Sequence, residues 1–130
     1  MRAKPAIIVV DDEERVRQLI HSFLREDYDV LLAADGLEAM DCYELHAGRI
    51  AAVITDVRMP RVNGWELVAW LHRRRRQLPV IIVSGYTGEV NLESLLLRRE
   101  VVGLEKPFEV KELVTTLKRM LEAPGGNTRA

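Results

Sequence analysis

The sequence predicts an α/β fold in which a doubly wound, five-stranded parallel sheet, (βα)5, carries helices on both faces. Three observations lead to this prediction. Five short apolar runs rich in Val and Ile recur along the chain, and a longer polar and apolar segment follows each of them. Strict alternation of this kind is typical of parallel sheets with right-handed crossovers. The 130 residues, 48% of them hydrophobic, suffice to bury one core.

The strands are predicted from continuous apolar runs, which indicate strands covered on both faces. In chain order these runs are residues 6–10, 30–34, 51–55, 80–83 and 101–104. The segments that follow them predict helices at residues 14–25, 37–45, 65–75, 90–98 and 110–121. The last helix has the clearest signal, because Val110, Leu113, Val114, Leu117 and Leu121 repeat at helical spacing. We expect one domain over residues 1–122 and a frayed tail, APGGNTRA, over residues 123–130.

Charge and composition exclude several classes of protein. A net charge of -1 gives no general attraction to nucleic acid or to anionic membranes. The single cysteine, Cys42, excludes an internal disulfide and is expected to be a small packing residue. No apolar run approaches the roughly 20 residues that span a bilayer. The start, MRAKPAIIVV, continues into acids where a signal peptide has its cleavage site. These features predict a cytoplasmic protein without membrane insertion.

Polar side chains with related chemistry stand at the ends of four predicted strands. Asp11 and Asp12 follow the first strand, Asp56 follows the third, Ser84 the fourth and Lys106 the fifth. Ligands of parallel α/β sheets bind beyond the carboxyl ends of the strands. We therefore expect these side chains to form one site.

The four acids of DDEE, residues 11–14, have two explanations. Asp12 as the N-cap, with Glu13 and Glu14 in the first helical turn, would stabilise the helix. Capping does not explain why Asp11, at the carboxyl end of the strand, is also acidic. Two carboxylates about 4 Å apart repel by roughly 4 kcal/mol at an effective dielectric constant near 20, and a divalent cation relieves such repulsion. The pattern predicts Mg²⁺, held directly by Asp12 and Asp56 and through water by Asp11.

The remaining residues suit the transfer of a phosphoryl group. A carboxylate such as Asp56 can attack phosphorus and form an acyl phosphate. Lys106 offers a compact positive charge to a phosphoryl oxygen, and the Ser84 hydroxyl can donate a hydrogen bond to another. Pro107 makes a cis bond after Lys106 plausible.

The motifs DDEE, TDVRMPRVNG, VSGYTG and EKPF, in this order, resemble the receiver domain of bacterial two-component response regulators. The resemblance covers about residues 5–122. It implies the flavodoxin-like strand order 2-1-3-4-5. It also implies a phosphorelay role in which a histidine kinase or a histidine phosphotransfer domain donates the phosphoryl group. The fourth helix, fifth strand and fifth helix would form the face for an output partner or a homodimer.

The resemblance also implies a role for each site residue. Asp56 would be the phosphoacceptor, Ser84 the switch hydroxyl and Lys106 the lysine that contacts the phosphoryl group. Asp11 and Asp12 would hold Mg²⁺ together with Asp56, and the backbone carbonyl of residue 58, an arginine here, would complete the metal site.

Two departures from the family pattern bear on signal transmission. Family members usually carry an aromatic residue three positions before the lysine, where this chain has Gly103. The GA pair that commonly precedes the fifth strand is replaced by Arg99 and Glu100. We expect neither change to affect phosphoacceptance, but both put in doubt the switch mechanism that the resemblance implies.

Two alternative functions compete with the phosphoacceptor module. A magnesium-dependent phosphohydrolase with an aspartyl-phosphate intermediate would normally need a second carboxylate two residues after the nucleophile and a cap over the substrate. Position 58 is Arg58, and no insertion is long enough for a cap. A pseudo-receiver that binds partners without phosphate is opposed by the complete acidic set. No output domain fits after residue 121, so the chain is either a stand-alone regulator or a fragment of a longer regulator or hybrid kinase.

Several surface features are also predicted. The run HRRRRQ, residues 72–77, ends the third helix, where cations face solvent and complement the helix terminus. Without interleaved aromatic residues it does not predict direct nucleic-acid binding. Trp70 lies opposite Leu67 and Leu71 on that helix and is expected to be exposed, as is part of the leucine run at residues 95–97. The three histidines, at residues 21, 46 and 72, are expected at the surface.

Overall fold

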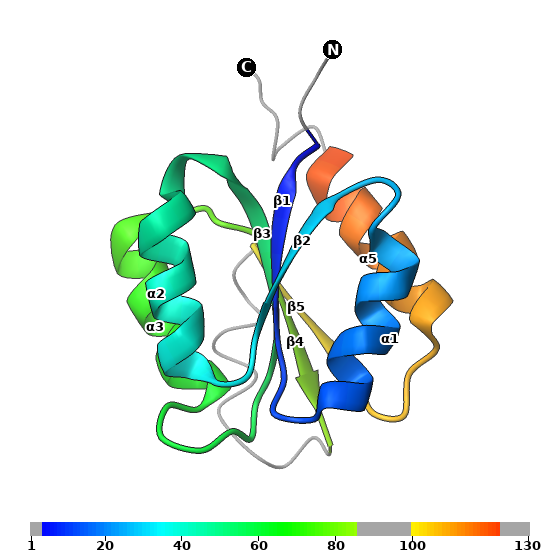
Figure 1. Cartoon of the computed structure of the whole chain (residues 1–130), viewed down its shortest axis with the longest axis horizontal. Coiled ribbons are helices and arrows are strands. Elements are labelled where there is room, and N and C mark those ends of the chain that lie inside the picture. The colour runs from blue at the N-terminus through cyan, green and yellow to red at the C-terminus, as the bar shows by residue number, and fades with distance from the viewer. Residues whose placement is uncertain (1–3, 86–99, 123–130) are drawn as a thin grey trace.

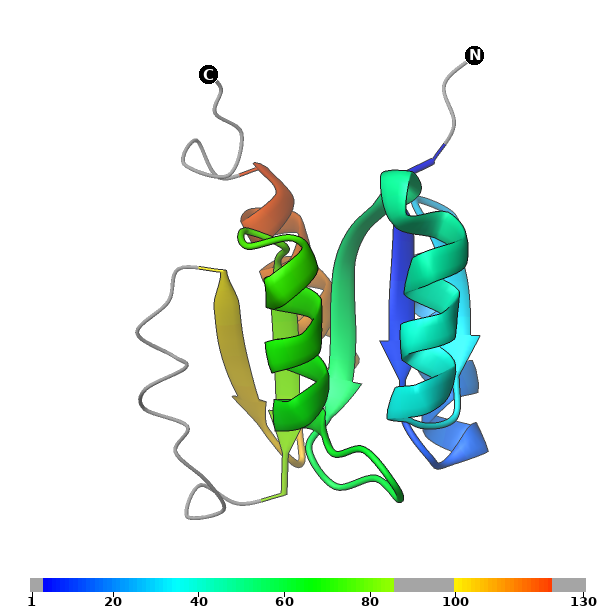
Figure 2. The ribbon, with the colours of Figure 1, turned by 90° about the vertical axis from the view of Figure 1, so that its left-hand side faces the viewer.

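Five parallel strands form the centre of the molecule, and the computed structural model describes residues 4–85 and 100–122. The strand order is β2-β1-β3-β4-β5, as the family resemblance implied. Helices α2 and α3 cover one face of the sheet, and α1 and α5 cover the other (Figure 1). Seen from the side, the strands all point the same way (Figure 2). The elements are β1 (Ala6–Val10), α1 (Glu14–Leu24), β2 (Asp29–Ala33), α2 (Gly36–His46), the short 3-10 helix η1 (Ala47–Arg49), β3 (Ile50–Asp56), α3 (Gly64–Arg74), β4 (Val80–Ser84), β5 (Val101–Glu105) and α5 (Val110–Glu122).

The predicted strands and described helices are confirmed, and each boundary falls within one residue of its prediction. The predicted helix at residues 90–98 and the leucines at residues 95–97 lie outside the described residues. The central strand β1 shows why the pattern was clear, because all five of its residues are buried. Alternate residues enter two cores: Ile8 and Val10 pack under α2 and α3, while Ile7 and Val9 pack under α1 and α5.

The start of α1 differs from the capping explanation of the acids. The N-cap residue is Glu13 rather than Asp12, and its side chain makes no capping hydrogen bond. The Asp11 carboxylate instead accepts the backbone N–H of Glu13 at 2.9 Å. Helix α1 begins one residue later than this explanation required, and Asp12 remains exposed.

Two surface predictions for α3 are wrong. Trp70 is half-buried, because α2 lies beside α3 and places Tyr43 edge-on to the indole at 6.0 Å between ring centroids. Arg74 covers the same indole, with its guanidinium 3.6 Å from the ring centroid. His72 is only 7% exposed, and its Nε2 lies 2.9 Å from the carbonyl oxygen of Leu78. The chain turns back after α3 and brings this carbonyl to the imidazole.

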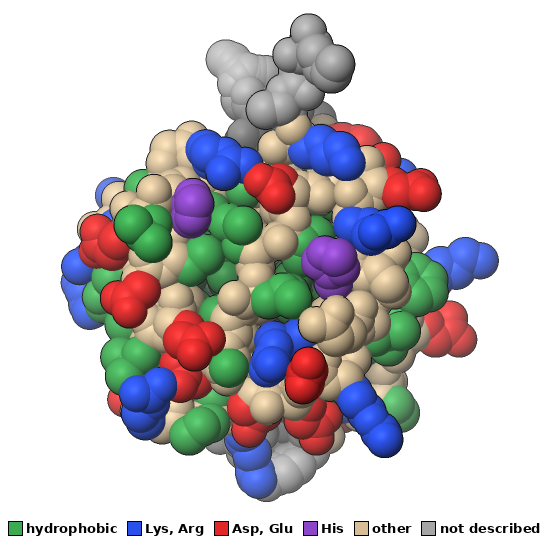
Figure 3. Space-filling view, viewed as in Figure 1, with side chains coloured by type: hydrophobic (Ala, Val, Ile, Leu, Met, Phe, Trp, Pro, Cys, Tyr) green, Lys and Arg blue, Asp and Glu red, His purple; other side chains and the backbone are tan. Residues whose placement is uncertain are grey.

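Charges of both signs are interspersed over the face that Figure 3 shows, in keeping with the small net charge. Within the arginine run, Arg74 pairs with Glu44 of α2 at 3.1 Å, and the Arg75 guanidinium donates to the carbonyl of Ile50. Cys42 is half-buried against the core beneath α2 and α3. Among the described residues, no helix has the length and apolar character needed to cross a membrane.

Candidate functional site

The carboxyl ends of the strands bring the predicted site residues to one edge of the sheet. Asp11 directly follows β1, Asp56 is the last residue of β3, and Ser84 is the last residue of β4. Lys106 follows β5, and its backbone N–H donates to the carbonyl of Ser84 at 2.7 Å. Asp12 stands beside Asp11 at the same edge. Because the strands are parallel, residues far apart in the sequence meet here.

Three carboxyl groups form an acidic cluster, defined as Asp11, Asp12 and Asp56. One oxygen of each lies within 4.8 Å of the others. Asp11 and Asp56 are only 4% and 7% exposed, whereas Asp12 is exposed. Hard carboxylate oxygens, two of them shielded and one open to water, suit Mg²⁺, which takes a few carboxylates and keeps several waters. The cluster is able to hold a divalent metal ion.

Asp11 shows the electrostatic cost of this arrangement. The pKa of Asp11 is raised from 3.8 to about 6, chiefly by burial; the hydrogen bond from Glu13 N–H partly offsets the effect of burial, and the charge of Asp56 adds to it. The guanidinium of Arg17 donates to the backbone carbonyl of Asp11 at 2.6 Å. This hydrogen bond holds the backbone of Asp11 and does not involve its carboxylate. A cation at the cluster would lower the energy of the charged form.

The Asp56 carboxylate is held at both oxygens. The Lys106 ammonium donates to Oδ2 at 3.0 Å, and the backbone N–H of Val57 donates to Oδ1 at 2.7 Å. The hydroxyl of Thr55 donates to the Asp56 backbone carbonyl at 2.9 Å. Burial lowers the pKa of Lys106, but the hydrogen bond and charge of Asp56, with the charges of Asp11 and Glu13, outweigh it and raise the pKa above its usual value. The lysine is therefore charged beside a positioned carboxylate.

The other predicted residues lie close to this pair in the chain or in the sheet. Ser84 is 5% exposed and pairs with Glu105 across β4 and β5. The peptide bond between Lys106 and Pro107 is cis. Arg58 follows two residues after Asp56, with an exposed side chain, in the loop that connects β3 to α3. The metal contact of its carbonyl stays a prediction.

The loop between β3 and α3, residues 57–63, contacts residues that sequence reasoning missed. The Arg61 guanidinium forms an ion pair with the Asp35 carboxylate at the N-terminus of α2. Asp35 caps α2, since its Oδ1 accepts the N–H of Glu38 at 2.9 Å. An Asp three residues before a Glu is a helix-start signal that would have identified the cap. No sequence signal identifies its partner, 26 residues away.

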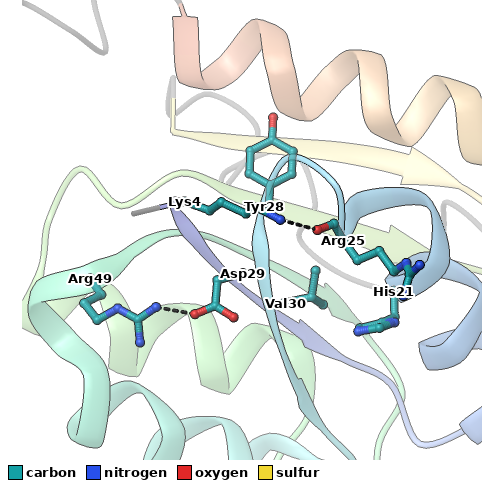
Figure 4. A pocket seen from close by; sticks show the side chains of 7 residues that line it. All are labelled: Lys4, His21, Arg25, Tyr28, Asp29, Val30 and Arg49. Carbon is teal, nitrogen blue, oxygen red and sulfur yellow. Dashed lines mark hydrogen bonds and ion pairs between the residues drawn. The ribbon is translucent and has the colours of Figure 1, made fainter. Parts of the chain in front are cut away.

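A hollow of about 310 Å³ lies at the amino ends of β1 and β2 (Figure 4). Basic side chains line it, but the structure gives two of them local partners. Lys4 donates to the carbonyl of Arg25, just after α1, at 3.0 Å, and Arg49 pairs with Asp29. Cations at a helix C-terminus stabilise its negative end. These contacts account for Lys4 and Arg49 without a ligand, and the hollow lies at the opposite end of the strands from the acidic cluster.

Comparison with known proteins identifies the family. The family model for the response regulator receiver domain matches residues 7–118. The chain belongs to the receiver domain family. Receiver domains are phosphoacceptor modules of phosphorelay signalling rather than classical enzymes, so the phosphohydrolase alternative is not supported.

The receiver domain is similar to parts of longer proteins. It is 34% identical over 117 residues to the sensor kinase CckA of Brucella abortus, covering 89% of this chain and 12% of that protein. It spans between 12% and 52% of the length of the first curated relatives that it matches.

Solved receiver structures have the same fold. The receiver domain of the hybrid histidine kinase CckA is 36% identical with a TM-score of 0.77, over 90% of this chain and 99% of that one. A chain of the CheX–CheY–BeF3–Mg²⁺ complex from Borrelia burgdorferi is 25% identical with a TM-score of 0.75, over 88% of this chain and 87% of that one. That relative was therefore crystallised with a magnesium ion and a partner protein.

Proposed function

We propose that Asp56 is the phosphoacceptor of this receiver domain and that a phosphohistidine of a histidine kinase or a histidine phosphotransfer domain is the donor. One observation carries the proposal. The Asp56 carboxylate belongs to the acidic cluster and also contacts the Lys106 ammonium at 3.0 Å. A phosphoryl group on Asp56 would therefore lie between a metal site and a fixed positive charge, which is the arrangement that stabilises phosphoryl transfer.

In the proposed reaction, one oxygen of the Asp56 carboxylate attacks the phosphorus of phosphohistidine. An O–P bond forms, the N–P bond breaks, and its electron pair returns to the imidazole, which takes up a proton. Lys106 stabilises charge on the phosphoryl oxygens, and the hydroxyl of Ser84 donates a hydrogen bond to one of them. The Val57 N–H orients the attacking carboxylate through its bond to Oδ1.

The metal proposed for the cluster is Mg²⁺. Asp12 and Asp56 would bind it directly, Asp11 through water, and the backbone carbonyl of Arg58 would be a further ligand. The donors fit, since all are hard oxygens, and burial disfavours the charged form of Asp11 unless a cation is near. When bound, Mg²⁺ neutralises charge that develops on the transferring phosphoryl oxygens.

We propose that the protein neither binds nucleic acid directly nor inserts into a membrane. The donor domain would be a protein carrying phosphohistidine, and the reaction would take place in the cytoplasm. The face that includes β5 and α5 would then meet an output partner or a second copy. Gly103 lies in β5 opposite Ile82 of β4 and has no side chain to reorient, so we propose that transmission relies less on β5 than in relatives with an aromatic residue there.

Phosphoramidate, a small N–P donor, tests the proposal. Incubation of the protein with phosphoramidate and Mg²⁺ is expected to add one phosphoryl group, measured by intact mass. Chelation of Mg²⁺ should suppress the addition, and Asp56→Asn should abolish it because the nucleophile is lost. An unchanged addition in Asp56→Asn would contradict the assignment of Asp56.

A further inference from the structure

The loop at residues 57–63 follows strand β3, but its tip contacts the start of helix α2. The Arg61 guanidinium pairs with the Asp35 carboxylate, whose side chain is 9% exposed. The two oxygens of Asp35 have separate partners: Oδ1 caps α2 through the N–H of Glu38, and Oδ2 contacts Arg61. Arg61 and the Glu38 N–H hold the pKa of Asp35 below its usual range, which keeps the carboxylate charged.

The backbone at Arg61 is in an unusual conformation. Its φ angle is 71°, in the left-handed region that arginine rarely adopts, and it is the only non-glycine residue of the described ranges with a positive φ. The N–H of Val62 donates to the carbonyl of Pro60 at 2.8 Å, so Arg61 is the central residue of a γ-turn. Strained turns of this kind persist where surrounding contacts determine them.

Two more contacts hold the loop. Val62 packs so closely on Gly36 at the start of α2 that a Cβ on Gly36 would lie 2.7 Å from Val62 side-chain carbons. At the base, the N–H of Gly64 donates to the carbonyl of Val57 at 2.8 Å. The loop is thus closed where it leaves β3 and attached to α2 at its tip. Residue 58 lies between these two anchors.

We propose that Arg61 is a positioning residue whose ion pair with Asp35 fixes the β3–α3 loop and thereby holds the backbone of Arg58 at the metal site. The inference rests on the proposed function, which makes the carbonyl of Arg58 a metal ligand. Residues that orient metal ligands typically change metal affinity when they are replaced, although they do not touch the ion. Arg61 acts in this way through the loop backbone.

Mg²⁺ titration of the full chain by calorimetry tests the role directly. Arg61→Ala is expected to weaken Mg²⁺ binding by about tenfold, at the lower end of the effects of outer-shell groups. Arg61→Lys keeps the positive charge, so it should retain most of the wild-type affinity for Mg²⁺. Asp35→Asn keeps a capping acceptor but loses the charge, so it should weaken binding as Arg61→Ala does. The double variant should be no weaker than either single variant, because both remove the same contact.

Two further variants separate the ion pair from other effects. Arg61→Gly suits a left-handed φ but has no cation, so it should bind Mg²⁺ as weakly as Arg61→Ala. Arg49→Ala removes a different ion pair, with Asp29 at the amino ends of the strands, and should bind Mg²⁺ like the wild type. Urea unfolding of each variant verifies that it folds.

Wild-type affinity in Arg61→Ala, or in Arg61→Gly alone, would overturn the positioning role and leave the phosphoacceptor proposal intact. A wild-type protein that binds no Mg²⁺ would contradict the metal site itself, and the positioning role with it.

Discussion

At the scale of single residues, Asp11 combines burial with two acidic neighbours. Its carboxyl group is 4% exposed and belongs to the acidic cluster with Asp12 and Asp56. Because its pKa is raised to about 6, the metal-free folded state holds a proton between about pH 4 and pH 6 that the unfolded state has already lost. The charged form of Asp11 therefore lowers the stability of the metal-free fold.

This cost predicts a pH dependence. Because the folded pKa exceeds the unfolded value, the contribution of Asp11 to the free energy of unfolding is fully present below the unfolded pKa of 3.8 and is lost as the pH rises through about 6. Asp11→Asn should remove this loss of stability with rising pH, because asparagine does not ionise. In urea unfolding with a chelator, the variant should gain about 3 kcal/mol relative to the wild type between about pH 4 and pH 7, because each unit of pKa corresponds to about 1.4 kcal/mol. A difference that does not change with pH would contradict the raised pKa.

Residue identity and spacing predicted that the site's side chains meet at one edge of the sheet, because each stands at or just after the end of a strand. They did not predict contacts between side chains that only the tertiary structure brings together. Arg61 and Asp35 are 26 residues apart, and an arginine in a polar loop gives no signal of its partner. His72 stands at the start of a run of arginines, and its burial depends on the returning carbonyl of Leu78.

At the scale of elements, the hydrophobic pattern predicted which segments form strands but not where pairing ends. β3, β4 and β5 each extend to a polar residue, Asp56, Ser84 and Glu105 respectively, because parallel pairing continues past the apolar run. The hydrophobic pattern also does not show which local hydrogen bonds form at the start of a helix. α1 starts without a capping side chain, and the pattern of acids could not reveal that the Asp11 carboxylate would occupy the Glu13 N–H.

The junction between β3 and α3 gives a prediction at this scale. Gly64 begins α3 against the end of β3, and a Cβ there would lie 2.3 Å from the Asp56 carbonyl oxygen. Gly64→Ala should therefore destabilise the protein by about 2 kcal/mol, because rigid backbone must move. Gly48→Ala is the matched control, since a Cβ at Gly48 meets nothing within 4 Å. Equal urea midpoints for the two variants would show that the close approach does not constrain the junction.

At the scale of the whole molecule, alternation of apolar runs and helical segments was sufficient for the fold class. The strand order came from the family resemblance and is confirmed. Alternation does not specify which strand lies beside which, because a right-handed crossover allows a new strand on either side of the sheet. The side-by-side placement of α2 and α3 explains why Trp70 is half-buried.

Mg²⁺ should stabilise the whole fold, because a ligand that prefers the native state shifts the unfolding equilibrium. At a concentration 100 times its dissociation constant, the gain is about 2.7 kcal/mol. Asp12→Ala should abolish this gain, as a direct ligand is lost. Its metal-free melting temperature should equal or exceed that of the wild type, because Asp12 is exposed and its charge disfavours the charged form of Asp11. A wild-type Mg²⁺ response in Asp12→Ala, measured by thermal unfolding, would count against the metal site.

Chemical trapping can locate the residue that carries the phosphoryl group. After phosphorylation with phosphoramidate and Mg²⁺, borohydride reduces an acyl phosphate and marks the aspartate that carried it. Peptide mass spectrometry then locates the mark. We predict that it lies on Asp56 alone. A mark on Asp11, Asp12 or any other carboxylate, or a phosphoryl group that resists reduction, would show that Asp56 is not the phosphoacceptor.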